Sequence, residues 1–134
     1  MFEKFHFTQN QVERHYRSGL KDFNIASKSE IAEVSFRFCY DAIIKLAITI
    51  CAHDGLRVKA RTGHHIELIQ KLADYLGEKE IILIVNDMRT KRNRDLYGDG
   101  FPISEREIED YIKWTRKIFD LAEPYLKRNK RLKL

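Results

Sequence analysis

Apolar residues recur at every third or fourth position along most of the chain, which is the spacing of a helix with one buried face. The pattern predicts five helices, at about residues 8–25, 28–53, 62–76, 81–97 and 105–124. The run IILIV at 81–85 could also form a buried strand, but the helical spacing continues through Met88, Arg92 and Leu96. Because short connections favour antiparallel neighbours, the sequence predicts an all-α fold, a four- to five-helix up-and-down bundle.

Two of the predicted helices begin with the spacing of a capping box, a serine followed three residues later by a glutamate. Ser27 with Glu30 is expected to start the second helix, and Ser104 with Glu107 the last. Pro124 is expected to kink or end that last helix. The second helix is apolar on more than one face, so it is either surrounded by other helices or forms half of a dimer interface.

The length of 134 residues and the 43% share of hydrophobic residues fit one domain, residues 1–134, with a core of its own. The longest apolar run, at 42–52, contains Lys45 and is too short to span a membrane. Cys39 and Cys51 are 12 positions apart in one predicted helix, about 18 Å along its axis, so they are expected to be buried free thiols. No spacing favours a metal site, and no cofactor motif is present. The N-terminus lacks a signal peptide, so a cytoplasmic protein is expected.

The net charge of +5 comes from the end of the chain. Residues 127–133, KRNKRLK, hold five basic residues and no acid, which leaves 20 basic and 20 acidic residues before them. This basic C-terminal tail, residues 127–134, could contact nucleic acid or could simply be solvated.

A second basic segment, MRTKRNRDLYGDG at 88–100, carries four cations within six positions: Arg89, Lys91, Arg92 and Arg94. One interpretation is a solvated helix end. Cations near a helix C-terminus complement its dipole, and Lys91 can pair with Asp87 one turn earlier.

The other interpretation of this segment is a phosphate site. With about 3.6 residues per turn, Arg89, Asn93 and Tyr97 share one stripe of the helix, and Arg92 lies on the next. A guanidinium can bind phosphate through two N–H groups, while the amide and the phenol can hydrogen-bond to a nucleotide.

Three segments taken together resemble one family. They are the unit R-N-x-x-x-Y at 92–97, an apolar helix leading to the Gly-His-His step at 63–65, and the S-x-x-E start of the last helix at 104–107. In this order they resemble the small stand-alone HEPN proteins (higher eukaryotes and prokaryotes nucleotide-binding) of bacteria and archaea, over nearly the whole chain. The resemblance implies a helical bundle, usually a homodimer, in which the arginine motifs of two subunits face one another across a cleft. Many such domains are metal-independent endoribonucleases, often toxins of toxin–antitoxin or phage-defence systems paired with a small nucleotidyltransferase, and others only bind nucleotide or RNA.

The catalytic pattern of that family, R-x(4 to 6)-H, can be carried over residue by residue. Arg92 takes the place of the catalytic arginine, Asn93 that of the polar residue after it, and Tyr97 that of the histidine. A tyrosine, whose pKa is about 10, is a poor base at neutral pH, although it can donate a proton or orient a water molecule. Arg92 can stabilise the charge of a phosphorane-like transition state or hold a phosphate. The motif is therefore compatible with cleavage and with binding.

Further polar residues are expected to bind phosphate or nucleotide: Arg89, Arg94, His64 and Arg61. His64 or its neighbour His65 could replace the missing histidine if the third helix begins near the end of the fourth. Otherwise one of them caps its helix and the other packs against the core. Asp41, an acid within the most apolar helix, is expected to pair with Arg89 or Arg92 and to orient it.

Three functions follow as hypotheses. An RNA- or nucleotide-interacting protein that is a metal-independent endoribonuclease would cleave RNA without metal and would depend on Arg92. A non-catalytic nucleotide- or RNA-binding module, partnering a nucleotidyltransferase, would bind phosphate without turnover. A structural helical dimer would change little when Arg89, Arg92 and Arg94 are neutralised.

Overall fold

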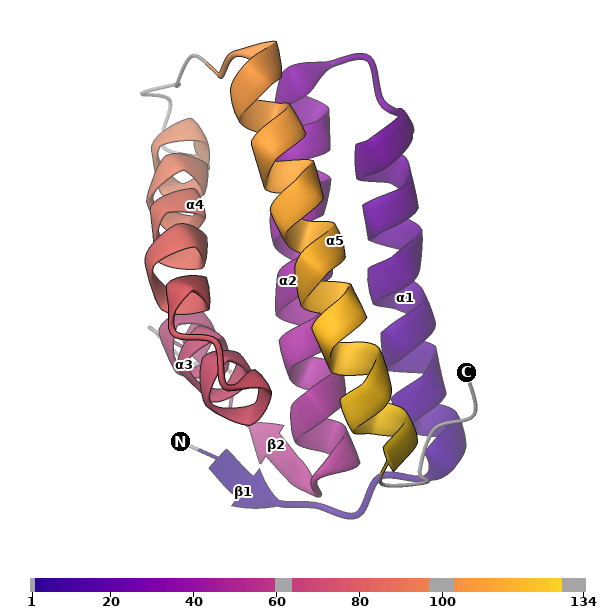
Figure 1. The fold of residues 1–134 in the computed structure, drawn as a ribbon. Helices are drawn as coiled ribbons and strands as arrows, with labels where there is room; N and C mark the ends of the chain where they lie inside the picture. Colours follow the sequence, from indigo (N-terminus) through magenta and orange to yellow (C-terminus); the bar gives the residue numbers. More distant parts are fainter. Residues whose placement is uncertain (1, 60–63, 97–102, 129–134) are drawn as a thin grey trace.

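The computed structural model describes residues 2–59, 64–96 and 103–128, which form five helices and two short strands (Figure 1). In chain order the elements are β1 Phe2–Lys4, α1 Gln9–Lys28, α2 Ala32–His53, β2 Leu56–Val58, α3 His64–Leu76, α4 Glu80–Leu96 and α5 Glu105–Arg128. The predicted all-α bundle is confirmed, and the ambiguous run at 81–85 lies within α4 as a helix.

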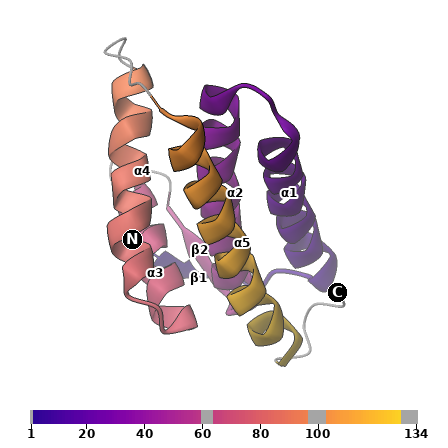
Figure 2. The ribbon, with the colours of Figure 1, turned by 45° about the horizontal axis from the view of Figure 1, so that its top comes forward.

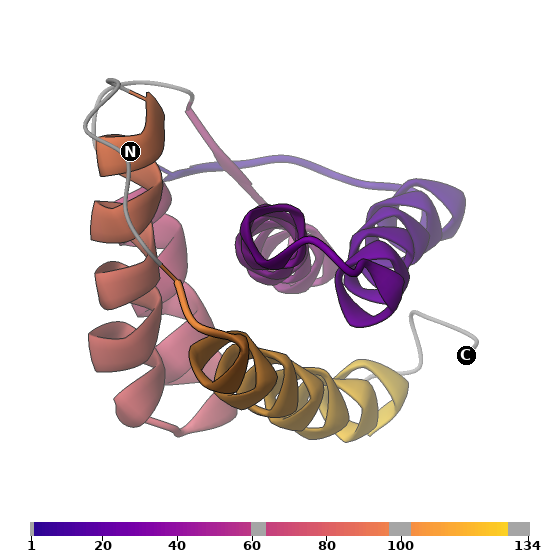
Figure 3. The ribbon, with the colours of Figure 1, turned by 90° about the horizontal axis from the view of Figure 1, so that it is seen from above.

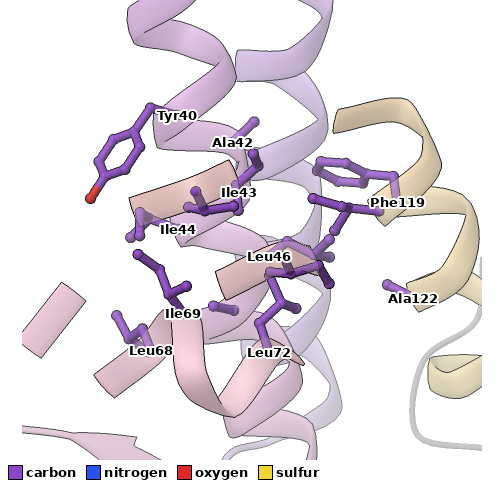
Figure 4. Close-up of a cluster of buried hydrophobic side chains, with 14 of the residues drawn as sticks. Tyr40, Ala42, Ile43, Ile44, Leu46, Leu68, Ile69, Leu72, Phe119 and Ala122 are labelled. Carbon is purple, nitrogen blue, oxygen red and sulfur yellow. The ribbon is translucent and has the colours of Figure 1, made fainter. Parts of the chain in front are cut away.

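Helix α2 is the centre of the bundle. It packs against α1, α3, α4 and α5, and the view from above places α1 on one side of it and α3 and α4 on the other (Figure 3). Fourteen of its 22 residues are buried, so its apolar surface is covered on several sides within one chain. Ile43 and Leu46 of α2 meet Ile69 of α3 and Phe119 of α5 in a cluster of buried side chains (Figure 4). Each such side chain stabilises the fold by about 1.5–3 kcal/mol relative to exposure.

One of the two predicted capping boxes is confirmed. The N–H group of Glu107 donates to Oγ of Ser104 at 3.1 Å, and the N–H group of Ser104 donates to Oε1 of Glu107 at 3.2 Å. The helix that this box starts does not end at Pro124 but continues to Arg128.

The capping box predicted at Ser27 and Glu30 is wrong. Ser27 lies in the last turn of α1, where its hydroxyl donates to the carbonyl of Phe23 at 3.0 Å. The chain turns two residues later, because the N–H group of Ile31 donates to the hydroxyl of Ser29 at 3.2 Å. Helix α2 then begins at Ala32 without a side-chain cap.

A two-stranded antiparallel sheet was not predicted from the sequence. Phe2 of β1 lies opposite Val58 of β2, in a segment expected to be only a connector. Gly55, with φ +77°, makes the turn that leads from α2 into β2. The sheet holds the start of the chain next to the connection between α2 and α3.

Three sequence expectations can be compared with the described residues. Cys39 and Cys51 are buried free cysteines, and burial raises the pKa of their thiols to about 11 and about 12, so neither is a thiolate at neutral pH. None of the helices in the described part of the chain is both long and apolar enough to cross a membrane. No group of three or more potential metal ligands lies together among the same residues.

Candidate functional site

The phase of α4 decides where its arginines lie. Ile81, Val85 and Met88 are fully buried against the bundle, and Arg92 continues the same stripe about one turn after Met88. The stripe that packs on α2 therefore ends in a cation. Arg92 is half-buried for this reason, while Arg94 is exposed.

The guanidinium of Arg92 lies over the ring of Tyr40, with its Cζ 5.5 Å from the ring centroid. Tyr40, in the middle of α2, is fully buried. A desolvated contact between a cation and an aromatic ring contributes up to about 2 kcal/mol. Burial raises the pKa of Tyr40 to about 12 even though Arg92 and Arg89 lower it, so the phenol is neutral at neutral pH.

The hydroxyl of Tyr40 connects this arginine to the start of α3. It lies 2.9 Å from Nδ1 of His65, and the two ring centroids are 5.7 Å apart. Burial, together with the charges of His64, Arg92 and Arg89, lowers the pKa of His65 to about 4. The imidazole is thus neutral at neutral pH, and with its proton on Nε2 it can accept a hydrogen bond from the Tyr40 hydroxyl at Nδ1.

Two more side chains complete the group. The ring of His64 is 4.5 Å from that of His65, edge to face. Asp41 is half-buried, and burial raises its pKa, while Arg92 is the cation that lowers that pKa most. We call Tyr40, Asp41, His64, His65, Arg89 and Arg92 the Arg92 cluster.

The Arg92 cluster lies within a recognised family domain. The family model of the HEPN domain matches residues 12–125, from α1 to α5. The chain belongs to the HEPN family. HEPN domains are all-α and are generally linked to ribonuclease or nucleotide-interacting functions. Neither the comparison with curated proteins nor the comparison with solved structures gave a match.

The four cations of the basic segment have different surroundings in this HEPN domain. Lys91 does not join the Arg92 cluster: its Nζ donates to the hydroxyl of Tyr111 and lies 3.3 Å from carboxylate oxygens of both Asp87 and Glu107. The predicted pair of Asp87 and Lys91 is confirmed. Burial opposes the charge of Lys91, but the hydrogen bonds to Tyr111 and Asp87 outweigh it and raise the pKa of Lys91. Lys91 thus joins α4 to α5.

The remaining predicted site residues divide into three groups. Arg89 lies within the cluster, and its Nε donates to Oδ1 of Asn86 on its own helix at 3.4 Å. Asn93 is half-buried on α4, on the stripe next to Arg92. Arg61 and Tyr97 lie outside the described residues.

Two members of the cluster were underestimated from the sequence. Tyr40 is a core residue, and its hydroxyl, at the edge of the aliphatic cluster in Figure 4, meets His65. His65, rather than His64, is the histidine that contacts Tyr40. In the sequence, both histidines stand directly before the apolar residues of α3. Their position therefore could not tell which of them contacts Tyr40.

Proposed function

We propose that this HEPN protein binds RNA, or a nucleotide, through phosphate groups that contact the Arg92 cluster. The observation that carries the proposal is the position of Arg92 over the buried ring of Tyr40. A ring contact uses the flat side of a guanidinium, so the N–H groups at its edge can still hold a phosphate by paired, charge-assisted hydrogen bonds. Arg89 brings a second positive charge to the same cluster.

The alternative of a solvated helix end describes only part of the basic segment. It fits Arg94, which is exposed. It does not describe Arg92, whose guanidinium is half-buried over the ring of Tyr40 and close to His65 instead of extending into solvent. A neutral His65 can still donate one hydrogen bond to an anion from Nε2.

Cleavage of RNA without a metal ion is the second candidate function. Such a reaction needs a base for the 2′-hydroxyl, an acid for the leaving 5′-oxygen and a cation for the phosphate. The pair of imidazoles beside Arg92 favours it. However, a pKa of about 4 makes His65 a poor proton donor at neutral pH, so the proton transfers would be assigned to His64 and to Tyr97. We therefore place binding before cleavage.

The biological setting follows from which of the two functions operates. An active ribonuclease would be a toxin of a toxin–antitoxin or defence system, whereas a protein that binds without cleavage would partner a nucleotidyltransferase. In both settings we propose a homodimer in which two Arg92 clusters face a shared cleft.

Binding is tested by fluorescence polarisation with a labelled single-stranded RNA and wild-type, Arg92→Ala and Arg14→Ala proteins. Arg14 is an exposed arginine of α1, so its replacement removes the same charge at another place. Loss of a charge-assisted hydrogen bond of 1.5–3 kcal/mol is expected to weaken RNA binding about 10- to 100-fold in Arg92→Ala. Equal affinities of the two variants, or no binding by the wild type, would contradict the proposal.

Cleavage is tested by incubating total RNA and tRNA with each protein in EDTA and separating the products on a denaturing gel. The variants are Arg92→Ala, His64→Ala and Tyr97→Phe, with Arg14→Ala as the control. Products that need Arg92 would establish metal-independent cleavage, and the other two lanes would assign the proton transfers. Arg92-dependent binding without products would establish a binding protein.

A further inference from the structure

A groove runs along α1 beside the start of α2, with a volume of about 590 Å³. Its apolar lining consists of the aliphatic side chains Leu20, Ile25 and Val34. Helix α1 and α4 lie on opposite sides of the molecule (Figure 2), so the groove is separate from the Arg92 cluster. The RNA-binding proposal does not involve it.

The polar lining of the groove is positively charged. Arg17, Lys21 and Lys28 line it together with Asn24 and Ser29, and none of the acidic residues in the described part of the chain does. At about 100° per residue, the three cations fall within about 40° of one another on α1 and span about 16 Å along its axis. All three are exposed, and the pair of Arg17 with Glu13 is weak because it is 3.7 Å long and the arginine side chain is 77% exposed.

We infer that this groove docks an amphipathic helix of a partner protein, one that carries Asp or Glu residues beside an aliphatic stripe. The aliphatic lining would take the apolar face of the helix, as helix-binding grooves do. The row of three cations would pair with its acidic residues and fix its direction. Ile31, in the connection between α1 and α2, lies between the groove residues Ser29 and Val34 in the sequence and is a 58% exposed aliphatic residue.

Two other occupants fit the groove less well. Single-stranded RNA gains much of its affinity from bases stacked on aromatic rings, and the lining of this groove is aliphatic. A second copy of the chain, related by a two-fold axis, would place the same groove against itself. The three cations of one copy would then face the three cations of the other and repel them. An acidic amphipathic helix meets neither difficulty.

The test uses a labelled synthetic helical peptide with leucines spaced three and four residues apart and glutamates on both flanks. A matched peptide carries lysines in place of the glutamates. The proteins are the wild type and the triple variant Arg17→Glu, Lys21→Glu, Lys28→Glu, in which only exposed side chains change and whose fold is checked by circular dichroism. A second variant, Ile25→Ser, weakens the aliphatic lining without changing charge.

The wild type is expected to bind the glutamate peptide at least about tenfold more tightly than the lysine peptide, and the triple variant to reverse this preference. Ile25→Ser is expected to weaken both complexes. The inference is overturned if the wild type binds neither peptide or does not distinguish them. It is also overturned if RNA displaces the glutamate peptide, or if the protein dimerises through the groove.

Discussion

The hydroxyl of Tyr40 lies 2.9 Å from Nδ1 of His65, across 25 residues of sequence. This one contact ties the middle of α2 to the first turn of α3, while the ring of the same tyrosine lies under Arg92 of α4. A buried hydroxyl needs a partner, and here the partner is a group of the candidate site. Tyr40 therefore orients both the cation and the imidazole of the Arg92 cluster.

Replacement of Tyr40 by Phe separates its two contacts. The variant keeps the ring under Arg92 and loses the hydrogen bond to His65, so the free energy of unfolding is expected to fall by about 0.5–1.5 kcal/mol while RNA affinity is largely retained. Tyr40→Leu loses the ring as well and is expected to weaken RNA binding further. Urea denaturation and fluorescence polarisation measure the two effects, and equal RNA affinities of the Phe and Leu variants would show that the ring does not position Arg92.

The low pKa of His65 makes stability depend on pH. Between its ordinary pKa of 6.5 and about 4 the unfolded chain binds a proton that the folded protein does not. The stability that neutral His65 contributes is thus complete above pH 6.5 and is lost as the pH falls toward 4. Because the residue is only half-buried, the loss is expected to be about 1–2 kcal/mol.

This loss is measured as the free energy of unfolding at several pH values for wild type and His65→Gln. The variant is expected to have the flatter slope across that range, and His6→Gln, at an exposed histidine, serves as the control. His15, whose pKa burial also lowers, contributes in the same direction in all three proteins, so only the difference in slope is used. If the free energy of unfolding depends on pH in the same way in wild type and His65→Gln, the lowered pKa of His65 is contradicted.

Lys91 and Arg94 are expected to differ although they are neighbours on α4. Lys91→Met removes the ammonium from Tyr111, Asp87 and Glu107. Since these acids are partly exposed, the expected loss is about 1 kcal/mol of unfolding free energy. Arg94→Met, at an exposed position, is expected to change stability by less than about 0.5 kcal/mol. Denaturant midpoints measure both stabilities. The assignment of Lys91 to the contact between α4 and α5 fails if Lys91→Met reduces the free energy of RNA binding by more than the free energy of unfolding.

The two serine–glutamate spacings give a further comparison. Ser104→Ala removes a real helix cap and is expected to destabilise the protein by about 0.5–2 kcal/mol. Ser27→Ala is expected to be neutral or slightly stabilising, because Ser27 lies inside α1 and alanine favours helices. Thermal unfolding of both variants decides, and equal losses would mean that Ser27 starts a helix after all.

The sequence predicted the helices because apolar residues recur with helical spacing, on one stripe of most helices and on several sides of α2. For α4, the helical spacing that continues through Met88, Arg92 and Leu96 favoured helix over strand, and the structure has a helix there. The boundary at Ser27 could not be predicted in the same way, since a Ser-x-x-Glu spacing also occurs within continuous helices and a hydrogen bond from Ile31 to Ser29 makes the turn. Strands of three residues are too short to show an alternating pattern.

Only part of the candidate site could be predicted. Arg92 could be predicted, because the R-N-x-x-x-Y motif consists of residues that are close together in the sequence. The meeting of Tyr40 and His65 depends on how α3 packs against α2, and no spacing within either helix encodes that. Lys91 could not be separated from the arginines either, because its partner Tyr111 lies on another helix.

The most direct test of the central claim, that the Arg92 cluster is where RNA binds, is an NMR titration of the histidine ring signals. The protein has five histidines, of which His64 and His65 lie in the cluster and His6 is exposed at the N-terminus. With a short single-stranded RNA, the ring signals of His64 and His65 are expected to shift and that of His6 to stay in place. In Arg92→Ala the shifts are expected to disappear. Unmoved His64 and His65 signals when the protein is saturated with RNA, or shifts that persist in Arg92→Ala, would contradict the claim.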